Sequence, residues 1–322
     1  MEKFNHRVFG GALIKAINSN YNADFSGQPR TLPNGVVYAT DKVLKYAIRN
    51  YLKDAYDKER IFVFKSFTND VKPRTLDENF INIFGDFPKK TISKEVEKKG
   101  KTEIKEDVVI DRLGIAKKLL TCIDIRFFGA TYAGEENISI HGPVQINHGV
   151  NIWNENNIFS EQIMSPYRNS NESSSDSDAS TLGRQSKLQE GHYLHHFSIN
   201  PKTIEWYVKN GAPALSIEDI VKLKEAMSKG VTYYDSSAKA GCENELLVWV
   251  TLKQESKLVL PNFTQLMKMD KEKVDGKVQL DLSELKTVLE ANTTEIESIE
   301  ISLNQASIVI KNAPKNATIK SF

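Results

Sequence analysis

The sequence is poor in cysteine and has no long apolar run. Only two of its 322 residues are cysteines, Cys122 and Cys242, too few for a disulfide framework or a cysteine-based zinc site. No apolar stretch approaches the ~18 residues that a membrane span needs, and no N-terminal signal is visible. These absences predict a cytoplasmic protein without a membrane partner. Cys122 continues an apolar helix face, so we expect it to be a buried thiol.

The sequence also lacks the motifs of several enzyme classes. It contains no GxxxxGK[ST] phosphate loop, no GxGxxG dinucleotide turn and no GxSxG nucleophile elbow. Among its six histidines, His195 and His196 are adjacent, so on a strand they point to opposite faces. His192 and His196 can share a face, but no carboxylate or cysteine partner stands nearby in the sequence. Because a metal site needs three or four convergent ligands, we expect neither a metal nor a cofactor.

What is present is typical of a globular protein with exposed insertions. Hydrophobic residues make up 40% and charged residues 26%, which are ordinary values. The net charge of +1 neither indicates nor excludes a nucleic-acid partner. A mixed Lys/Glu stretch at 89–107 and an acidic, serine-rich run at 170–180 interrupt the apolar pattern. Such composition is typical of a solvated helix or hairpin and of a mobile loop.

Alternating apolar residues predict a sheet, and residues 124–147 are expected to form its centre. In that stretch we expect strands at 123–128, 138–140 and 144–146, separated by Gly129 and by His141-Gly142-Pro143. Helices are expected to begin at Thr40 and Ser216, whose hydroxyls suit N-caps. Others are expected at 111–122 and 203–210. Further strands are predicted at 6–17, 60–67, 191–201, 245–252, 278–282, 299–303 and 307–310.

The loop 18–35 follows the first expected strand and is rich in Asn, Ser, Gly and Pro. Long loops without secondary structure are usually functional or disordered. Its aromatics, Tyr21 and Phe25, have the chemistry to stack on a base, but they suit equally well as anchors of a polar loop. From the sequence the two interpretations stay open.

The helix from Thr40 carries a row of cations. Lys42, Lys45 and Arg49 share one face at i, i+3 and i+7, with no acid among them. This arrangement suits a phosphate backbone better than an internal lattice of ion pairs. A solvated basic face has the same spacing, and only the position of the helix, directly after the polar loop, favours binding.

Three motifs, together with the loop and the basic helix, carry a resemblance to a known family. They are Asp124-Ile-Arg-Phe-Phe-Gly-Ala-Thr131, Gly142-Pro-Val-Gln-Ile-Asn147 and Gly191-His-Tyr-Leu-His-His-Phe-Ser-Ile-Asn-Pro201. In this combination the sequence resembles the CRISPR-associated Cas-seven family, the repeated backbone subunit of type I Cascade complexes. Within it, the sequence is similar to the Csh-type branch of subtype I-B. The resemblance spans residues 4 to 252.

The resemblance implies an α+β fold with a modified RRM-like, ferredoxin-like palm, in which helices cover one face of an antiparallel sheet. The palm would comprise residues 1–67, 112–150 and 190–322, with a finger-like insertion at 68–111 and a flexible thumb-like insertion at 151–189. Copies would form a helical filament along the spacer of a guide RNA (crRNA) and present it to target DNA. A Cas-five-like cap and a large subunit would be further partners. Such a protein grips RNA by shape, without base readout.

The resemblance also implies individual roles, carried over by position. Lys42, Lys45 and Arg49 would grip phosphates, and the loop 236–241 would offer amides and a cation. In the thumb, Met164 or Leu182 would be the wedge that unstacks a base. No residue is expected to be catalytic. The residues implied to contact RNA are Lys42, Lys45, Arg49, Asn22, Gln28, Gln145, Asn147, Lys239 and Arg184.

Two other classes of function are open to this sequence. Subunits of the related type III complexes cut bound RNA with an acidic residue in the first loop, and Asp24 occupies such a loop. General acid–base cleavage would also need a 2′-hydroxyl in line, and the Csh-like motifs favour a non-cleaving role. A solitary RRM-type RNA binder would carry an aromatic RNP signature, which the sequence lacks.

Overall fold

The computed structural model describes residues 2–98, 101–154, 156–164 and 182–322, which divide into two compact units. The first unit comprises 1–5, 52–145 and 200–221, and the second comprises 6–51, 146–199 and 222–322. Helices α1 (Asp41–Ala55) and α6 (Ile217–Tyr233) each contribute to both. Both units are therefore assembled from segments that are far apart in the sequence.

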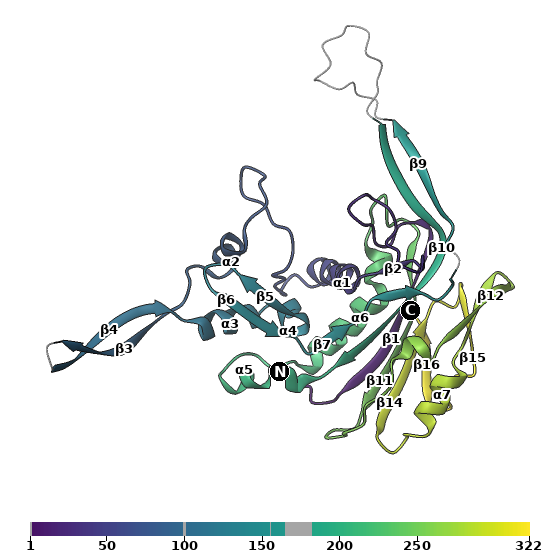
Figure 1. Cartoon of the computed structure of the whole chain (residues 1–322). Helices are drawn as coiled ribbons and strands as arrows, with labels where there is room; N and C mark the ends of the chain where they lie inside the picture. The colour runs from purple at the N-terminus through teal and green to yellow at the C-terminus, as the bar shows by residue number, and fades with distance from the viewer. Residues whose placement is uncertain (1, 99–100, 155, 165–181) are drawn as a thin grey trace, which may run out of the picture. The chain divides into compact units, whose positions relative to one another are not determined.

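Strand β1 (Val8–Ser19) is the centre of the main sheet, which lies in the second unit (Figure 1). Its apolar run is almost continuous and almost wholly buried, as expected of a strand covered on both faces. It pairs antiparallel with β10 (Leu182–Ile199) and β11 (Cys242–Leu252). Among the described residues the order is β16-β14-β11-β1-β10-β8-β2, and β7 and β9 also pair with β10. The other strands of this sheet are β2 (Tyr38–Ala39), β7 (Val144–Ile146), β8 (Gly149–Asn151), β9 (Ile158–Met164), β14 (Ile296–Leu303) and β16 (Ala317–Ser321).

Gly10 allows the three central strands to pack closely. A Cβ atom at this position would lie 2.1 Å from Cζ of Phe197 on β10 and 2.4 Å from the carbonyl oxygen of Val248 on β11. Both distances are far below van der Waals contact, so any side chain here would push the sheet apart. The glycine pair of the expected first strand thus marks a close approach, as its position in a strand suggests.

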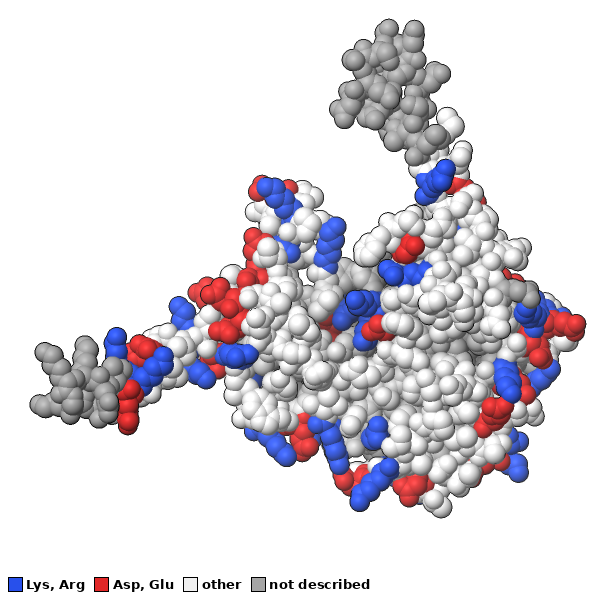
Figure 2. All heavy atoms as spheres, in the orientation of Figure 1, with Lys and Arg blue, Asp and Glu red and all other residues white. Residues whose placement is uncertain are grey.

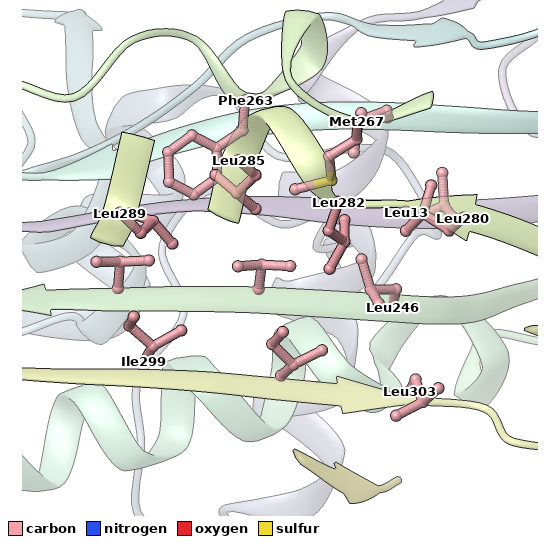
Figure 3. Packing of buried hydrophobic residues seen from close by; sticks show 14 of the residues in the cluster. Leu13, Leu246, Phe263, Met267, Leu280, Leu282, Leu285, Leu289, Ile299 and Leu303 are labelled. Carbon is pink, nitrogen blue, oxygen red and sulfur yellow. The ribbon is translucent and has the colours of Figure 1, made fainter. Parts of the chain in front are cut away.

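The main hydrophobic core lies between this sheet and the residues that follow β11 (Figure 3). Leu13 and Leu246 of the sheet pack with Phe263, Leu282 and Leu285, all of them 0% or 1% exposed. The last quarter of the chain therefore completes the core of the second unit. Its elements are η2 (Phe263–Gln265), β12 (Lys268–Val274), β13 (Lys277–Asp281), α7 (Ser283–Glu290) and β15 (Ile308–Lys311).

The first unit has its own smaller core, built from short helices around a β-hairpin. Phe80 and Ile115 are fully buried in it, together with Leu119 and Tyr132. The helix α2 begins at a capping box in which Thr75 and Glu78 satisfy each other's backbone amides. The elements are α2 (Leu76–Phe84), β3 (Lys89–Lys98), β4 (Lys101–Ile110), α3 (Arg112–Leu120), α4 (Ile123–Phe128), β5 (Gly129–Ala133), β6 (Asn137–His141), η1 (Pro201–Ile204) and α5 (Glu205–Lys209).

The expected central position of residues 124–147 is wrong. Residues 123–128 form the helix α4, and β5 pairs with β6 in a separate two-stranded sheet. The alternation of polar and apolar residues in this stretch is not that of a half-exposed strand, because Asp124 and Arg126 are both buried. Arg126 donates to both carboxylate oxygens of Asp219, at 3.1 and 2.8 Å. Partners distant in the sequence thus decide the local structure.

The expected strand at 60–67 is also wrong, for a related reason. The Asp124 carboxylate accepts hydrogen bonds from the backbone amides of Phe62 and Val63, both at 2.9 Å. These amides are therefore not available to a strand ladder, and the segment is irregular. The apolar alternation in it reflects the burial of Phe62 in the core of the first unit.

The strand predicted at 191–201 is part of a longer one, β10, which begins at Leu182, and the other predicted elements are confirmed within a few residues at their ends. The structure is a mixed α+β fold with a large, mainly antiparallel sheet. Of the two options for residues 89–107, the hairpin is correct, since β3 and β4 pair along their whole length. Ser216 caps α6, where its hydroxyl accepts from the Asp219 amide at 3.0 Å. Cys122 is buried as expected, and this raises the pKa of its thiol to about 12. Within the described residues, no helix is long and apolar enough to cross a membrane.

Candidate nucleic-acid interface

The cationic face of α1 lies in the second unit, and it is less purely basic than the sequence suggested. Lys42 is exposed, whereas Lys45 and Arg49 are half-buried. Nζ of Lys45 lies 2.8 Å from a carboxylate oxygen of Asp41, one turn earlier. The expectation that no acid lies among these cations is therefore wrong for Lys45. An incoming phosphate would therefore compete with Asp41 for this ammonium.

The surroundings reinforce this mixed character. His148 lies with Nδ1 3.9 Å from the other oxygen of Asp41. Figure 2 shows Lys and Arg side chains interspersed with Asp and Glu over the face in view, also along the β3–β4 hairpin, with no large field of one sign. A nucleic acid that contacts the surface seen in Figure 2 would therefore be bound by individual cations and not by a continuous basic patch.

The loop before α1 is held in place by its own polar side chains. Asn22 accepts hydrogen bonds through Oδ1 from the amide of Thr40, at 2.9 Å, and from its hydroxyl, at 3.0 Å. This ties the loop to the start of α1. Gln28 is half-buried, and its carbonyl accepts from the Asp24 amide at 2.8 Å. Asn22 thus lies at the start of the cationic helix with its side-chain carbonyl oxygen already used, whereas the hydrogen bonds of Gln28 are made within the loop.

The two aromatics of this loop have different roles. Tyr21 is 0% exposed and packs against Tyr193 and His195, so it anchors the loop and cannot stack on an external base. Phe25 is 105% exposed, the highest value among the large apolar side chains of the described residues. Tyr21 is therefore the anchor of the loop, whereas the Phe25 ring is left exposed.

Asp24, the candidate nuclease residue, is occupied by hydrogen bonds within its own turn. Its Oδ1 accepts from the hydroxyl and amide of Ser26, both at 2.8 Å, and from the Gln28 amide at 3.0 Å. The hydrogen bond from the Ser26 side chain, followed by those from the two amides, lowers the pKa of this carboxyl. A carboxylate with a lowered pKa is a weak general base.

Lys239 connects the loop 236–241 to the first loop from inside. Its ammonium donates to the carbonyl of Asn20, at 3.0 Å, and to that of Tyr21. The backbone adds a bond of 2.8 Å from the Asn20 amide to the Ala238 carbonyl. Burial lowers the pKa of Lys239. The predicted phosphate contact is thus half-buried and fastens the two loops together.

Gln145 and Asn147, both predicted to touch the sugar-phosphate chain, differ in availability. Gln145 belongs to the first unit and is exposed, with its side-chain amide donating to the Gly142 carbonyl at 2.8 Å. Asn147 is half-buried in the second unit, and its Oδ1 accepts from the His196 amide at 2.7 Å. Its carbonyl oxygen lies 2.9 Å from Nδ1 of His195. Both oxygens of Asn147 are therefore engaged with residues of β10 in the main sheet.

The remaining predicted contacts lie on a two-stranded ribbon formed by β9 and residues 182–188 of β10 (Figure 1), which we call the outer ladder. Arg184 is exposed and pairs with Gln162 across the ladder. Met164, one of the two proposed wedges, is 69% exposed at the end of β9, opposite Leu182. The serine-rich run at 170–180 lies outside the described residues.

The sequence analysis missed a buried charged pair in the sheet. His192 and Glu245 are both 0% exposed, with Nδ1 and Oε2 only 2.6 Å apart, and Glu190 lies 3.5 Å from Nε2. Burial lowers the pKa of His192, but the hydrogen bonds to the two carboxylates outweigh this and raise it above its usual value. The statement that this histidine lacks a carboxylate partner is therefore wrong. Within the described ranges no group of three such side chains is placed to hold a metal.

The structure thus brings part of the predicted site together. Asn22 bonds the start of α1 through Thr40, and Lys239 bonds the carbonyls of Asn20 and Tyr21 in the same loop. Asp41 on α1 lies near His148, next to Asn147. Arg184 and Met164 lie on the outer ladder, and Gln145 lies in the other unit. The resulting cluster offers cations and amides on a fixed scaffold, the combination that backbone-directed binding of a nucleic acid requires.

Comparison with known proteins gives one match to a family and several to solved structures. No curated protein sequence matches the chain. A chain described as "CRISPR RNA-guided surveillance complex" superimposes with a TM-score of 0.52 at 11% identity, covering 98% of this chain and 94% of its own. Another, described as "CRISPR RNA-guided surveillance complex, pre-nicking", gives 0.53 at 11% identity, covering 98% and 96%. At this identity the likeness shows the fold alone. The sequence model of the family "CRISPR-associated protein Cas7" matches residues 6–297, and the chain therefore belongs to the Cas7 family.

Proposed function

We propose that this protein is the crRNA-binding backbone subunit of a type I Cascade surveillance complex and acts in the cytoplasm. Copies would polymerise along the spacer of the guide RNA and present it for pairing with target DNA in antiviral defence. The observation that carries the proposal is the family match over residues 6–297. The two solved chains with the same fold belong, by their descriptions, to RNA-guided surveillance complexes.

The cluster at the start of α1 supports the proposal physically. A guide-RNA subunit must hold any spacer, so its contacts have to address phosphate and ribose and not the bases. Lys42, Lys45 and Arg49 supply cations on one helix face, next to a loop fastened by Asn22 and Lys239. Cations on a rigid scaffold give affinity without base readout.

In this proposal the fold is a modified RRM-like palm with two insertions. The finger would be residues 68–111, which include the β3–β4 hairpin, and would face target DNA. The thumb would be residues 151–189, which include the outer ladder, with Met164 or Leu182 as the wedge and Arg184 as a phosphate contact. We assign the protein to the Csh-type branch of subtype I-B. Its partners in the complex would be a Cas-five-like cap and a large subunit.

We propose a binding role and not a catalytic one. The rival function is RNA cleavage by Asp24, as in type III complexes. The Asp24 carboxylate accepts three hydrogen bonds from its own turn, and its pKa is lowered. Neither property favours acid–base catalysis.

Purification of the protein from its natural host tests the proposal. We expect RNA bearing CRISPR spacer sequences to co-purify, with other Cascade subunits identified by mass spectrometry. Titration of the purified chain with two RNAs of unrelated spacer sequence should give equal affinities. Bound RNA without spacer sequence, or strong discrimination between the two RNAs, would contradict the proposal.

A further inference from the structure

The first unit contains a pocket that the proposed RNA contacts do not use. It has a volume of about 450 Å³, and we call it the Trp206 pocket. Ala116 and Ile138 line it from the core, while the Trp206 side chain is 61% exposed at its edge. Lys90 and Arg112, both largely exposed, complete the rim. An apolar interior, an aromatic residue at the edge and a polar rim are typical of pockets that bind a side chain of a partner protein.

The polar groups of this pocket favour an apolar side chain over a nucleobase or a phosphate. Lys90 lies 3.9 Å from Asp111, and Arg112 lies 3.6 Å from Glu136, so the rim carries both signs. The hydroxyl of Tyr207, a further lining residue, already donates to the Ser139 carbonyl. A base edge would find few partners here, and a phosphate would meet two carboxylates.

The second unit presents a side chain of the matching kind. Phe25 is 105% exposed at the tip of the turn 22–30, which we call the Phe25 loop. The turn is fixed by backbone hydrogen bonds between Asp24 and Gln28, and between Gly27 and Asp24, as well as by the Asp24 carboxylate. Because the loop is already ordered, little conformational entropy would be lost when the ring is buried.

We propose that the Trp206 pocket of one copy binds the Phe25 loop of the next copy, a contact that rests on the proposed polymerisation along RNA. The charges on the two surfaces are complementary. Asp24 and Arg30 flank the Phe25 ring, and the guanidinium of Arg30 lies 5.9 Å from the centroid of that ring. Each can face an opposite charge on the rim. The two surfaces are different patches of the same chain, so the contact is head-to-tail and repeats from one copy to the next along the RNA.

A mixing experiment tests this with full-length chains on a long single-stranded RNA, with assemblies counted by mass photometry. Phe25→Ser removes the ring, and Ser139→Trp fills the pocket from an exposed strand position. Each variant alone should lose about 10- to 100-fold in copy-to-copy affinity, the effect of burying one aromatic side chain. Mixed, they retain one intact contact, so pairs should form and extend no further. Phe67→Ser, the same change at a Phe that is 44% exposed elsewhere, is the control and should assemble normally.

Full assembly by Phe25→Ser, or the absence of pairs in the mixture, would overturn the inference. An RNA too short for two copies separates copy contact from RNA contact. Wild type and Phe25→Ser should bind it equally, and weaker binding by the variant would mean that the ring stacks on a base, which also refutes the inference.

The inference can also be tested if the wild-type chain binds no RNA, an outcome that would refute the proposed function. Chains carrying Ser26→Cys and Ser139→Cys are then mixed under oxidising conditions without RNA. Both native cysteines are buried, so only the new thiols react. A disulfide-linked pair supports the contact, and its absence overturns it.

Discussion

Replacing Lys42, Lys45 and Arg49 by alanine should flatten the salt dependence of RNA binding by a calculable amount. Each phosphate contact on single-stranded nucleic acid contributes about 0.7 to the slope of log K against log salt. Three lost contacts therefore lower the slope by about 2. Between about 50 and about 200 mM salt, wild type should lose roughly 20-fold more affinity than the triple variant. Fluorescence anisotropy with a labelled RNA across this range measures both slopes.

A second substitution on the same helix face, Asp41→Asn, should have the opposite effect on RNA affinity. Asp41 holds the Lys45 ammonium at 2.8 Å, so Asp41→Asn removes a carboxylate that competes with phosphate. We expect this variant to bind RNA more tightly and with a steeper slope. Lys209→Ala is the control, because Lys209 lies on α5 in the first unit and pairs there with Glu205. An unchanged slope in the triple variant would refute the role assigned to α1.

Three further predictions concern buried charges and the first loop. In urea melts, the stability lost in His192→Gln should be largest below pH ~6.5 and should shrink as the pH rises through the raised pKa of His192. Contact with His192 helps to lower the pKa of Glu190 from 4.5 to about 2, so the effect should decline again as the pH falls through that interval; above pH ~6.5, a difference that grows with rising pH would contradict the prediction. Asp219→Ala leaves the Arg126 guanidinium buried without its bidentate partner and should cost about 3–5 kcal/mol of unfolding free energy; a neutral effect would refute this pairing. Asp24→Ala should leave binding to an RNA too short for two copies intact on native gels, and loss of an RNA-cutting activity would place the protein among the nucleases.

The sequence predicted best those elements that are decided by their own residues. The strand predicted at 6–17 and the Ser216 cap of α6 rest on local signals, and both are confirmed, although β1 is buried along almost its whole length and not in alternation. It failed at 60–67 and 123–128, where the deciding partners are far apart in the chain. Asp124 binds the amides of Phe62 and Val63, and Arg126 binds Asp219. A carboxylate in an alternating pattern looks exposed until its buried donors are known.

The candidate site shows the same limit in a different form. Asn, Gln and Lys in loops have the chemistry to contact RNA, but the same groups satisfy the backbone of a folded loop. The structure uses Asn147 and Lys239 in the second way, whereas Lys42 stays exposed. Neither composition nor spacing distinguishes these uses. The Trp206 pocket was out of reach for a similar reason, because its lining comes from β3, α3, β6 and α5.

Strand β10 belongs both to the main sheet and to the outer ladder, and this restricts how the outer ladder can change length during evolution. Residues 188–199 of this strand pair with β1, and residues 182–188 continue the same strand without interruption into the outer ladder. Inserting one residue in the outer part would turn every side chain beyond it to the opposite face. Homologues should therefore lengthen or shorten this ribbon in steps of two residues on each strand. Each step moves its tip by about 7 Å, and an alignment rich in odd steps would speak against this reasoning.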